Sequence, residues 1–155
     1  MFPSHDPTDP SLDVMVLFGP PGTSKTRYVY EIARREKLRL YTAPQTKNSG
    51  LYFDGYDPRE HDSILLDDMS GSRCNLRFMC QLLDIYPFQL PVHGGLVPTT
   101  CRRFFITANF HPKHWYKNVY SPDQWSINPL NRRISTLVFV PRPRVYFKFV
   151  RPLGS

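Results

Sequence analysis

Residues 14–26 constrain the fold of this chain more than any other stretch, because they join a hydrophobic strand to a glycine-rich turn that ends in lysine and threonine. Apolar residues then recur at near-helical spacing up to residue 36. Backbone N–H groups of such a turn, together with the N-terminus of the helix that follows, bind phosphate groups. We therefore expect a loop that binds a nucleoside triphosphate through Gly19, Pro20, Pro21, Gly22, Thr23, Ser24, Lys25 and Thr26.

Three residues of this loop carry specific expectations. Lys25 adds a positive charge near the β- and γ-phosphates, and the Thr26 hydroxyl is placed to bind Mg²⁺. Ser24 stands where the usual G-x-x-x-x-G-K pattern has its last glycine, which allows unrestricted φ and close approach of a ligand. Because serine is the next smallest residue with a polar group, we expect the loop to remain usable.

Two further hydrophobic strands end in polar residues. Residues 63–66 run into Asp67 and Asp68, and residues 103–108 run into Asn109. In open α/β sheets, ligands bind at the carboxyl ends of the strands. We expect one aspartate to position Mg²⁺ and the other to orient or deprotonate the attacking water, with the assignment open between them. Asn109 can hydrogen-bond both the γ-phosphate and this water without adding charge.

The charges are distributed unevenly along the chain. Residues 69–155 contain 12 of the 20 Lys and Arg residues but only 2 of the 13 Asp and Glu residues. This basic half predicts a polyanionic partner such as nucleic acid, with a generally basic surface as the alternative.

Three scattered cysteines without C-x-x-C spacing indicate a reducing compartment. Because the chain has neither a membrane-length apolar run nor a secretory signal, we expect an intracellular protein without a membrane partner.

Strands alternate with helices along the chain, which predicts an α/β fold with a central parallel sheet. Residues 88–98 predict a β-hairpin whose tip is His93, Gly94 and Gly95. The remaining expected elements are helices over 26–36 and 75–85, and strands over 38–42, 134–140 and 144–150.

In their order, these motifs resemble the superfamily-3 helicase domain of replication initiator (Rep) proteins from circular single-stranded DNA viruses, and circovirus-like Reps above all. Single motifs are shared with other phosphate-loop NTPases. A hairpin lies between the strand that ends in Asp67 and Asp68 and the strand that ends in Asn109, and an arginine pair follows. This order distinguishes the Rep helicase domains from other phosphate-loop NTPases. The resemblance covers roughly residues 14–140 and rests on residues 19–26, 52–56, 64–68, 86–87, 94–98, 105–109 and 129–134.

The resemblance implies an AAA+-like ATPase with helices on both faces of its sheet, which hydrolyses ATP with Mg²⁺ to translocate on single-stranded DNA during rolling-circle replication. It implies that Lys25 binds the phosphates and that Asn109 senses the γ-phosphate. Arg133, with Arg132 as its rival, matches an arginine finger that reaches the ATP of a neighbouring subunit. Such rings are usually hexamers, although a fragment like this one is also expected as a monomer, and the family implies action in the host nucleus.

The resemblance also assigns the hairpin tip, His93, Gly94 and Gly95, to the central channel as the single-stranded DNA contact. Circovirus-like proteins usually carry lysine where this chain has His93. We therefore expect DNA binding to be tighter at about pH 6 than at about pH 8. No H-x-H motif of a nicking endonuclease occurs in the chain, so we expect either an excised helicase domain or a stand-alone relative.

Several alternatives stay open from the sequence. An RNA-virus superfamily-3 NTPase of the picornavirus type shares the motor motifs, and a small-molecule kinase shares the phosphate loop. A third alternative is a catalytically weak DNA-binding or assembly module, in which Ser24 has reduced the use of ATP.

The expected domain organisation is a flexible lead-in over 1–13, the ATPase domain over 14–140, and a basic C-terminal strand and tail over 141–155.

Overall fold

A computed structural model describes residues 12–44 and 50–151, and its core is a six-stranded sheet in the order β2-β3-β6-β1-β7-β8. Neighbouring strands run parallel, except that β8 pairs antiparallel with β7. The expected α/β fold with a central, mostly parallel sheet is therefore confirmed. The strands are β1 (Asp13–Phe18), β2 (Leu40–Thr42), β3 (Ser63–Met69), β6 (Arg103–Ala108), β7 (Thr136–Arg142) and β8 (Val145–Val150).

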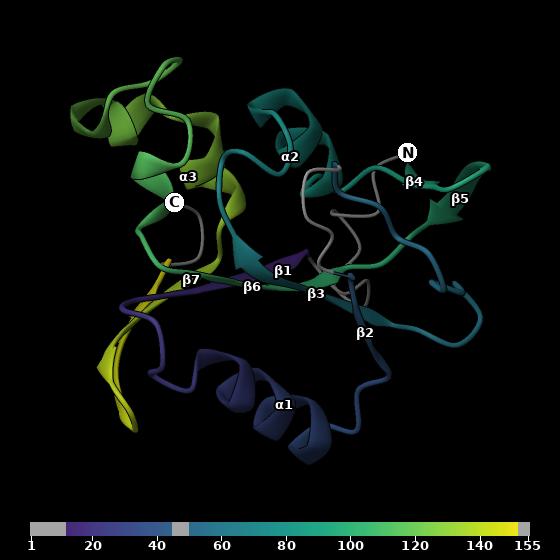
Figure 1. Ribbon diagram of the computed structural model, residues 1–155, viewed down its shortest axis with the longest axis horizontal. Helices are drawn as coiled ribbons and strands as arrows, with labels where there is room; N and C mark the ends of the chain where they lie inside the picture. The colour runs from purple at the N-terminus through teal and green to yellow at the C-terminus, as the bar shows by residue number, and fades with distance from the viewer. Residues whose placement is uncertain (1–11, 45–49, 152–155) are drawn as a thin grey trace.

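Helices cover both faces of this sheet. Helix α1 (Lys25–Arg35) lies on one face, whereas α2 (Leu76–Leu82) and α3 (Pro129–Arg133) lie on the other (Figure 1). Val29 and Ile32 of α1 are buried in one apolar cluster with Leu17 and Phe105 of the sheet. Each such buried side chain contributes roughly 1.5–3 kcal/mol of transfer free energy, so this face fixes the helix over the strand that precedes it.

The strand order brings the carboxyl ends of β1, β6 and β3 next to one another. Because β6 lies between β1 and β3, Ala108 at its end pairs with Phe18 on one side and with Met69 on the other. The phosphate loop after β1, the aspartates at the end of β3 and Asn109 after β6 therefore emerge at one edge of the sheet. None of the helices in residues 12–44 and 50–151 is both long and apolar enough to cross a membrane.

The predicted hairpin is present as a separate two-stranded antiparallel sheet, formed by β4 (Phe88–Val92) and β5 (Gly95–Thr99). Val92 pairs with Gly95, so the turn itself is His93 and Gly94, and Gly95 belongs to β5. Gly94 has a φ of 91°, which a residue with a side chain rarely adopts. The backbone N–H of the fully buried Phe53 donates to the Pro91 carbonyl at 2.8 Å and anchors the hairpin to the core.

The ends of several elements differ from the sequence predictions. Strand β1 includes Asp13 of the expected lead-in (1–13), of which residues 1–11 lie outside the described residues. Strand β2 starts at Leu40 and not at the predicted residue 38, because the chain first turns at Lys37, which has a φ of 57°. Helix α2 ends at Leu82 because the Asp84 carboxylate accepts the N–H of Ile85 at 2.7 Å, which a continuing helix would direct to a carbonyl.

The short helices between β6 and β7 were not predicted from the sequence. These are two 3-10 helices, η2 (Pro112–His114) and η3 (Pro122–Ile127), followed by α3. The Asn128 side chain accepts the N–H of Leu130 at 2.9 Å, and Pro129 occupies the first turn of α3. Asn before Pro is a readable helix start, so this signal was available in the sequence.

Candidate nucleotide-binding site

The phosphate loop has a backbone that requires small residues. A Cβ on Gly19 would lie 2.1 Å from the Val140 carbonyl oxygen, so no side chain fits there. Gly22 has a φ of 78°, and Ser24 has a φ of 67° and a ψ of 32°. Ser24 thus adopts the left-handed conformation for which the usual pattern supplies glycine, at a cost of about 1–2 kcal/mol for a residue with a side chain. The loop keeps the glycine conformation despite the serine.

Lys25 is buried at the start of α1 and held by the loop itself. Its ammonium donates to the carbonyls of Gly19 and Pro20, at 2.8 Å each. Burial lowers the pKa of Lys25, while the nearby charges of Asp68 and Asp67 act to raise it. The side chain therefore lies within electrostatic reach of both aspartates, as the sequence hypothesis requires.

The structure separates the surroundings of the two aspartates, beginning with Asp67. Its Oδ1 accepts the Thr26 hydroxyl at 2.6 Å and the Thr107 hydroxyl at 2.5 Å. Hydroxyl and carboxylate oxygens are hard ligands of the kind that Mg²⁺ prefers. The donor set formed by Thr26 and Asp67 therefore fits this ion. Thr107 was missed from the sequence, because a threonine in a hydrophobic strand gives no sign of the residue that it faces.

Asp68 is directed differently because β3 bulges at this point. The pairing of β3 with β6 shifts register between Leu66 and Met69, and Asp68 has a φ of 56°. Its backbone N–H donates to the Thr107 hydroxyl at 2.8 Å. Strained backbone of this kind occurs disproportionately at functional sites. The carboxylate of Asp68 is exposed and accepts no hydrogen bond from any residue that the structure describes.

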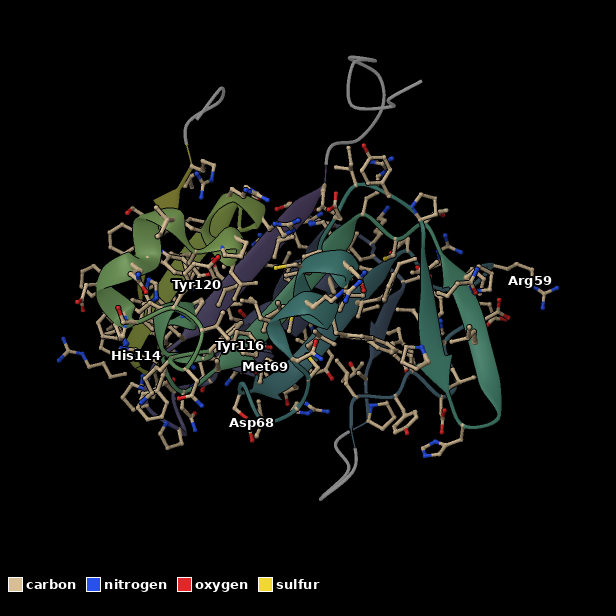
Figure 2. All side chains as sticks on the ribbon, turned by 90° about the horizontal axis from the view of Figure 1, so that it is seen from above. Arg59, Asp68, Met69, His114, Tyr116 and Tyr120 are labelled. Carbon is tan, nitrogen blue, oxygen red and sulfur yellow. The ribbon has the colours of Figure 1, made fainter. Side chains whose placement is uncertain are left out.

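Asn109 and Asp68 line one cavity of about 590 Å³ beside the loop. Met69 and His114 also line it, and Figure 2 shows both on the same side of the molecule as Asp68, with Arg59 at the opposite end. Asn109 and the two aspartates thus meet at the carboxyl edge of the sheet. Asn109 lies at the edge expected from its place at the end of a hydrophobic strand, and its role as a γ-phosphate sensor stays a prediction.

The two candidate arginine fingers differ sharply in their surroundings. Arg133 donates to the Cys80 carbonyl at 2.9 Å, to the Pro129 carbonyl at 3.1 Å and to the Asp84 carboxylate at 3.1 Å. Only 17% of its side chain is exposed, so it ties α3 to α2 within its own subunit. Arg132 is exposed and makes no hydrogen bond or ion pair with the residues of the described ranges.

The hairpin tip lies away from the phosphate loop and carries a charge pair. The Nδ1 of His93 lies 2.6 Å from the Asp54 carboxylate, whose other oxygen accepts the His93 backbone N–H at 2.8 Å. These two hydrogen bonds lower the pKa of Asp54. The imidazole also stacks on Tyr52, with ring centroids 4.1 Å apart. A protonated His93 would therefore be balanced by Asp54, a pairing that the sequence analysis did not anticipate.

This fold and this arrangement of lysine, aspartates and asparagine define the chain as a phosphate-loop NTPase domain. A family model described as RNA helicase matches residues 15–110. The chain is 35% identical over 131 residues to the replication-associated protein of Beak and feather disease virus, covering 83% of this chain and 39% of that protein. It is 33% identical over 135 residues to the replication-associated protein of Canary circovirus, covering 86% and 41%.

The chain therefore belongs to this superfamily-3 helicase family, as a circovirus-like Rep helicase domain. The resemblance drawn from the motifs is confirmed. The chain spans about 40% of the length of these two curated relatives. The family supports nucleotide binding with a metal, helicase-type ATPase activity and a role in viral replication.

Proposed function

We propose that this domain hydrolyses ATP to move along single-stranded DNA during replication of a circular viral genome, acting in the host nucleus as a ring of identical subunits, most simply a hexamer. The observation that carries the proposal is the convergence of Lys25, Asp67, Asp68 and Asn109 at the carboxyl ends of β1, β3 and β6. Ligands bind at this edge in open α/β sheets.

The proposed chemistry divides the work between the two aspartates. Thr26 and Asp67, already in contact at 2.6 Å, would hold Mg²⁺, which when bound neutralises charge on the phosphates. Lys25 binds the β- and γ-phosphates, and Asn109 hydrogen-bonds the γ-phosphate. Asp68 projects into the cavity without a competing hydrogen bond among the described residues, so it orients the attacking water and accepts its proton.

The arginine that completes the site in trans is, in this proposal, Arg132. A finger must leave its own subunit and stabilise charge on the transferring phosphoryl group of a neighbour. Arg133 would first have to break three hydrogen bonds to Cys80, Pro129 and Asp84. Arg132, on the same short helix, is exposed and has no such bonds to lose. The sequence pattern favoured Arg133 as the finger, whereas these contacts support Arg132.

The test of this function is ATP hydrolysis measured with single-stranded DNA, with single-stranded RNA and with neither. We expect hydrolysis that DNA stimulates more than RNA, and stimulation by RNA alone would favour the picornavirus-type alternative. Lys25→Ala should lose nucleotide binding, whereas Asp68→Asn should bind ATP and fail to hydrolyse it. Nucleotide and DNA binding without hydrolysis in the unaltered chain would instead support the weak module, whose structural basis is the left-handed Ser24.

A further inference from the structure

The cavity beside the catalytic edge extends beyond the residues that the proposed hydrolysis uses. None of the loop residues 19–26 lines it. Its lining comes from the end of β3 and the residues just after it, from Asn109 after β6, and from the segment that follows Asn109. The lining side chains that matter here are Asp68, Asn109, Phe110, His114, Trp115 and Lys117.

Lys117 contributes a positively charged side chain to the lining of the cavity. Lys117 is exposed and forms no ion pair with any carboxylate in the described ranges. Burial, and then the charges of Lys113 and Lys117, lower the pKa of His114. The ammonium of Lys117 therefore lies close enough to the His114 imidazole to affect its protonation. Within the cavity, Lys117 offers an anion a positively charged hydrogen-bond donor. No carboxylate of the described residues forms an ion pair with it.

The strand order relates the cavity to the phosphate loop. The loop that holds the phosphates follows β1, whereas the cavity lies over the ends of β3 and β6, on one side of β1 in the sheet. A triphosphate whose γ-phosphate faces Asp68 and Asn109 keeps its nucleoside on the far side of Lys25. When water attacks, the bond between the γ-phosphorus and the bridging oxygen breaks, and phosphate forms at the cavity entrance while ADP stays on the loop.

We propose that this cavity binds the inorganic phosphate released by hydrolysis, and that Lys117 is the cation that draws it from the catalytic edge. The inference rests on the proposed function, because that function supplies the phosphate. A fixed positive charge on the exit side offsets the repulsion between a phosphate dianion and Asp68. Asn109, at the junction of the two regions, can hydrogen-bond phosphate both before and after the bond breaks.

Direct phosphate binding tests the site without turnover. The full chain, loaded with ADP and Mg²⁺, is titrated with inorganic phosphate and followed by ³¹P line broadening. Lys117→Ala should weaken phosphate binding about tenfold, the usual scale for losing one charge-assisted hydrogen bond. Lys113→Ala is the matched control, because it removes a neighbouring charge outside the cavity lining and should leave the affinity unchanged. Equal affinity in the unaltered chain and the Lys117 variant overturns the proposal.

A second measurement separates this site from the nucleotide site. In steady-state hydrolysis, Lys117→Ala should weaken inhibition by added phosphate about tenfold while leaving the KM for ATP unchanged. An increase in KM with unchanged phosphate inhibition would place the nucleotide itself against Lys117 and overturn the inference. If the chain hydrolyses no ATP, the proposed function fails by itself, and the ³¹P titration still decides whether the cavity binds phosphate.

Discussion

The contrast between Arg132 and Arg133 gives the sharpest test of the trans arrangement. Arg133→Ala removes an ion pair to Asp84 and hydrogen bonds to two main-chain carbonyls, and leaves the half-buried carboxylate without its partner. Breaking a fully buried ion pair lowers the free energy of unfolding by about 3–5 kcal/mol, and breaking an exposed pair lowers it by less than about 1 kcal/mol. Because 17% of the Arg133 side chain and 33% of the Asp84 side chain are exposed, we expect an intermediate loss of about 2–3 kcal/mol. For a domain of this size that lowers Tm by about 5–10 °C.

Arg132→Ala should behave in the opposite way. It should change the stability by less than about 0.5 kcal/mol, because the side chain is exposed and has no partner among the described residues. It should reduce kcat by about 10³-fold or more while sparing nucleotide binding, as loss of a finger does. Thermal unfolding and steady-state hydrolysis, measured on both variants, check the pair. An Arg133 variant with unchanged Tm and abolished kcat, beside an active Arg132 variant, would refute the reasoning.

The remaining predictions concern the loop, a half-buried histidine and the hairpin. Ser24→Gly should raise Tm by about 2–4 °C, because it relieves about 1 kcal/mol of left-handed strain; an unchanged or lower Tm would show that the strain is absent. Burial, followed by the charges of Lys113 and His114, lowers the pKa of His111 to about 4. The stability that neutral His111 contributes is therefore complete above about pH 6.5 and lost as pH falls toward 4, by about 1–2 kcal/mol, and His111→Phe should flatten this part of a urea-unfolding profile. Asp54→Asn should strengthen single-stranded DNA binding, measured by fluorescence anisotropy, because it removes a negative charge that lies against the hairpin tip; an affinity that matches the unaltered chain would remove the tip from the DNA contact.

The parts of the site that the sequence predicted are those carried by local patterns. The phosphate loop, the acid strand, the Asn109 strand and the hairpin each combine a strand pattern with the polar or glycine residues at its end. The alternation of strands with helices along the chain also predicted the parallel sheet. Local patterns were sufficient because each of these motifs lies within one short segment.

The parts that the sequence left open depend on contacts between distant segments. The two aspartates are adjacent in sequence, and only the bulge in β3, with its hydrogen bond to Thr107, directs them to different surroundings. The choice between Arg132 and Arg133 depends on Asp84, which lies 49 residues from Arg133. The motif at residues 129–134 gives the order of the residues, but it does not show which of its two guanidinium groups is already bound within its own subunit.

The most direct test of the account mixes two inactive variants. Lys25→Ala and Arg132→Ala, each inactive alone, are combined in equal amounts with single-stranded DNA, and ATP hydrolysis is measured over a range of protein concentrations. If Arg132 completes a neighbour's site, about a quarter of the interfaces in a randomly mixed ring join an intact loop to an intact finger. The account predicts that activity returns toward that fraction and rises faster than linearly with concentration. No recovery, from variants that assemble as the unaltered chain does, would contradict it.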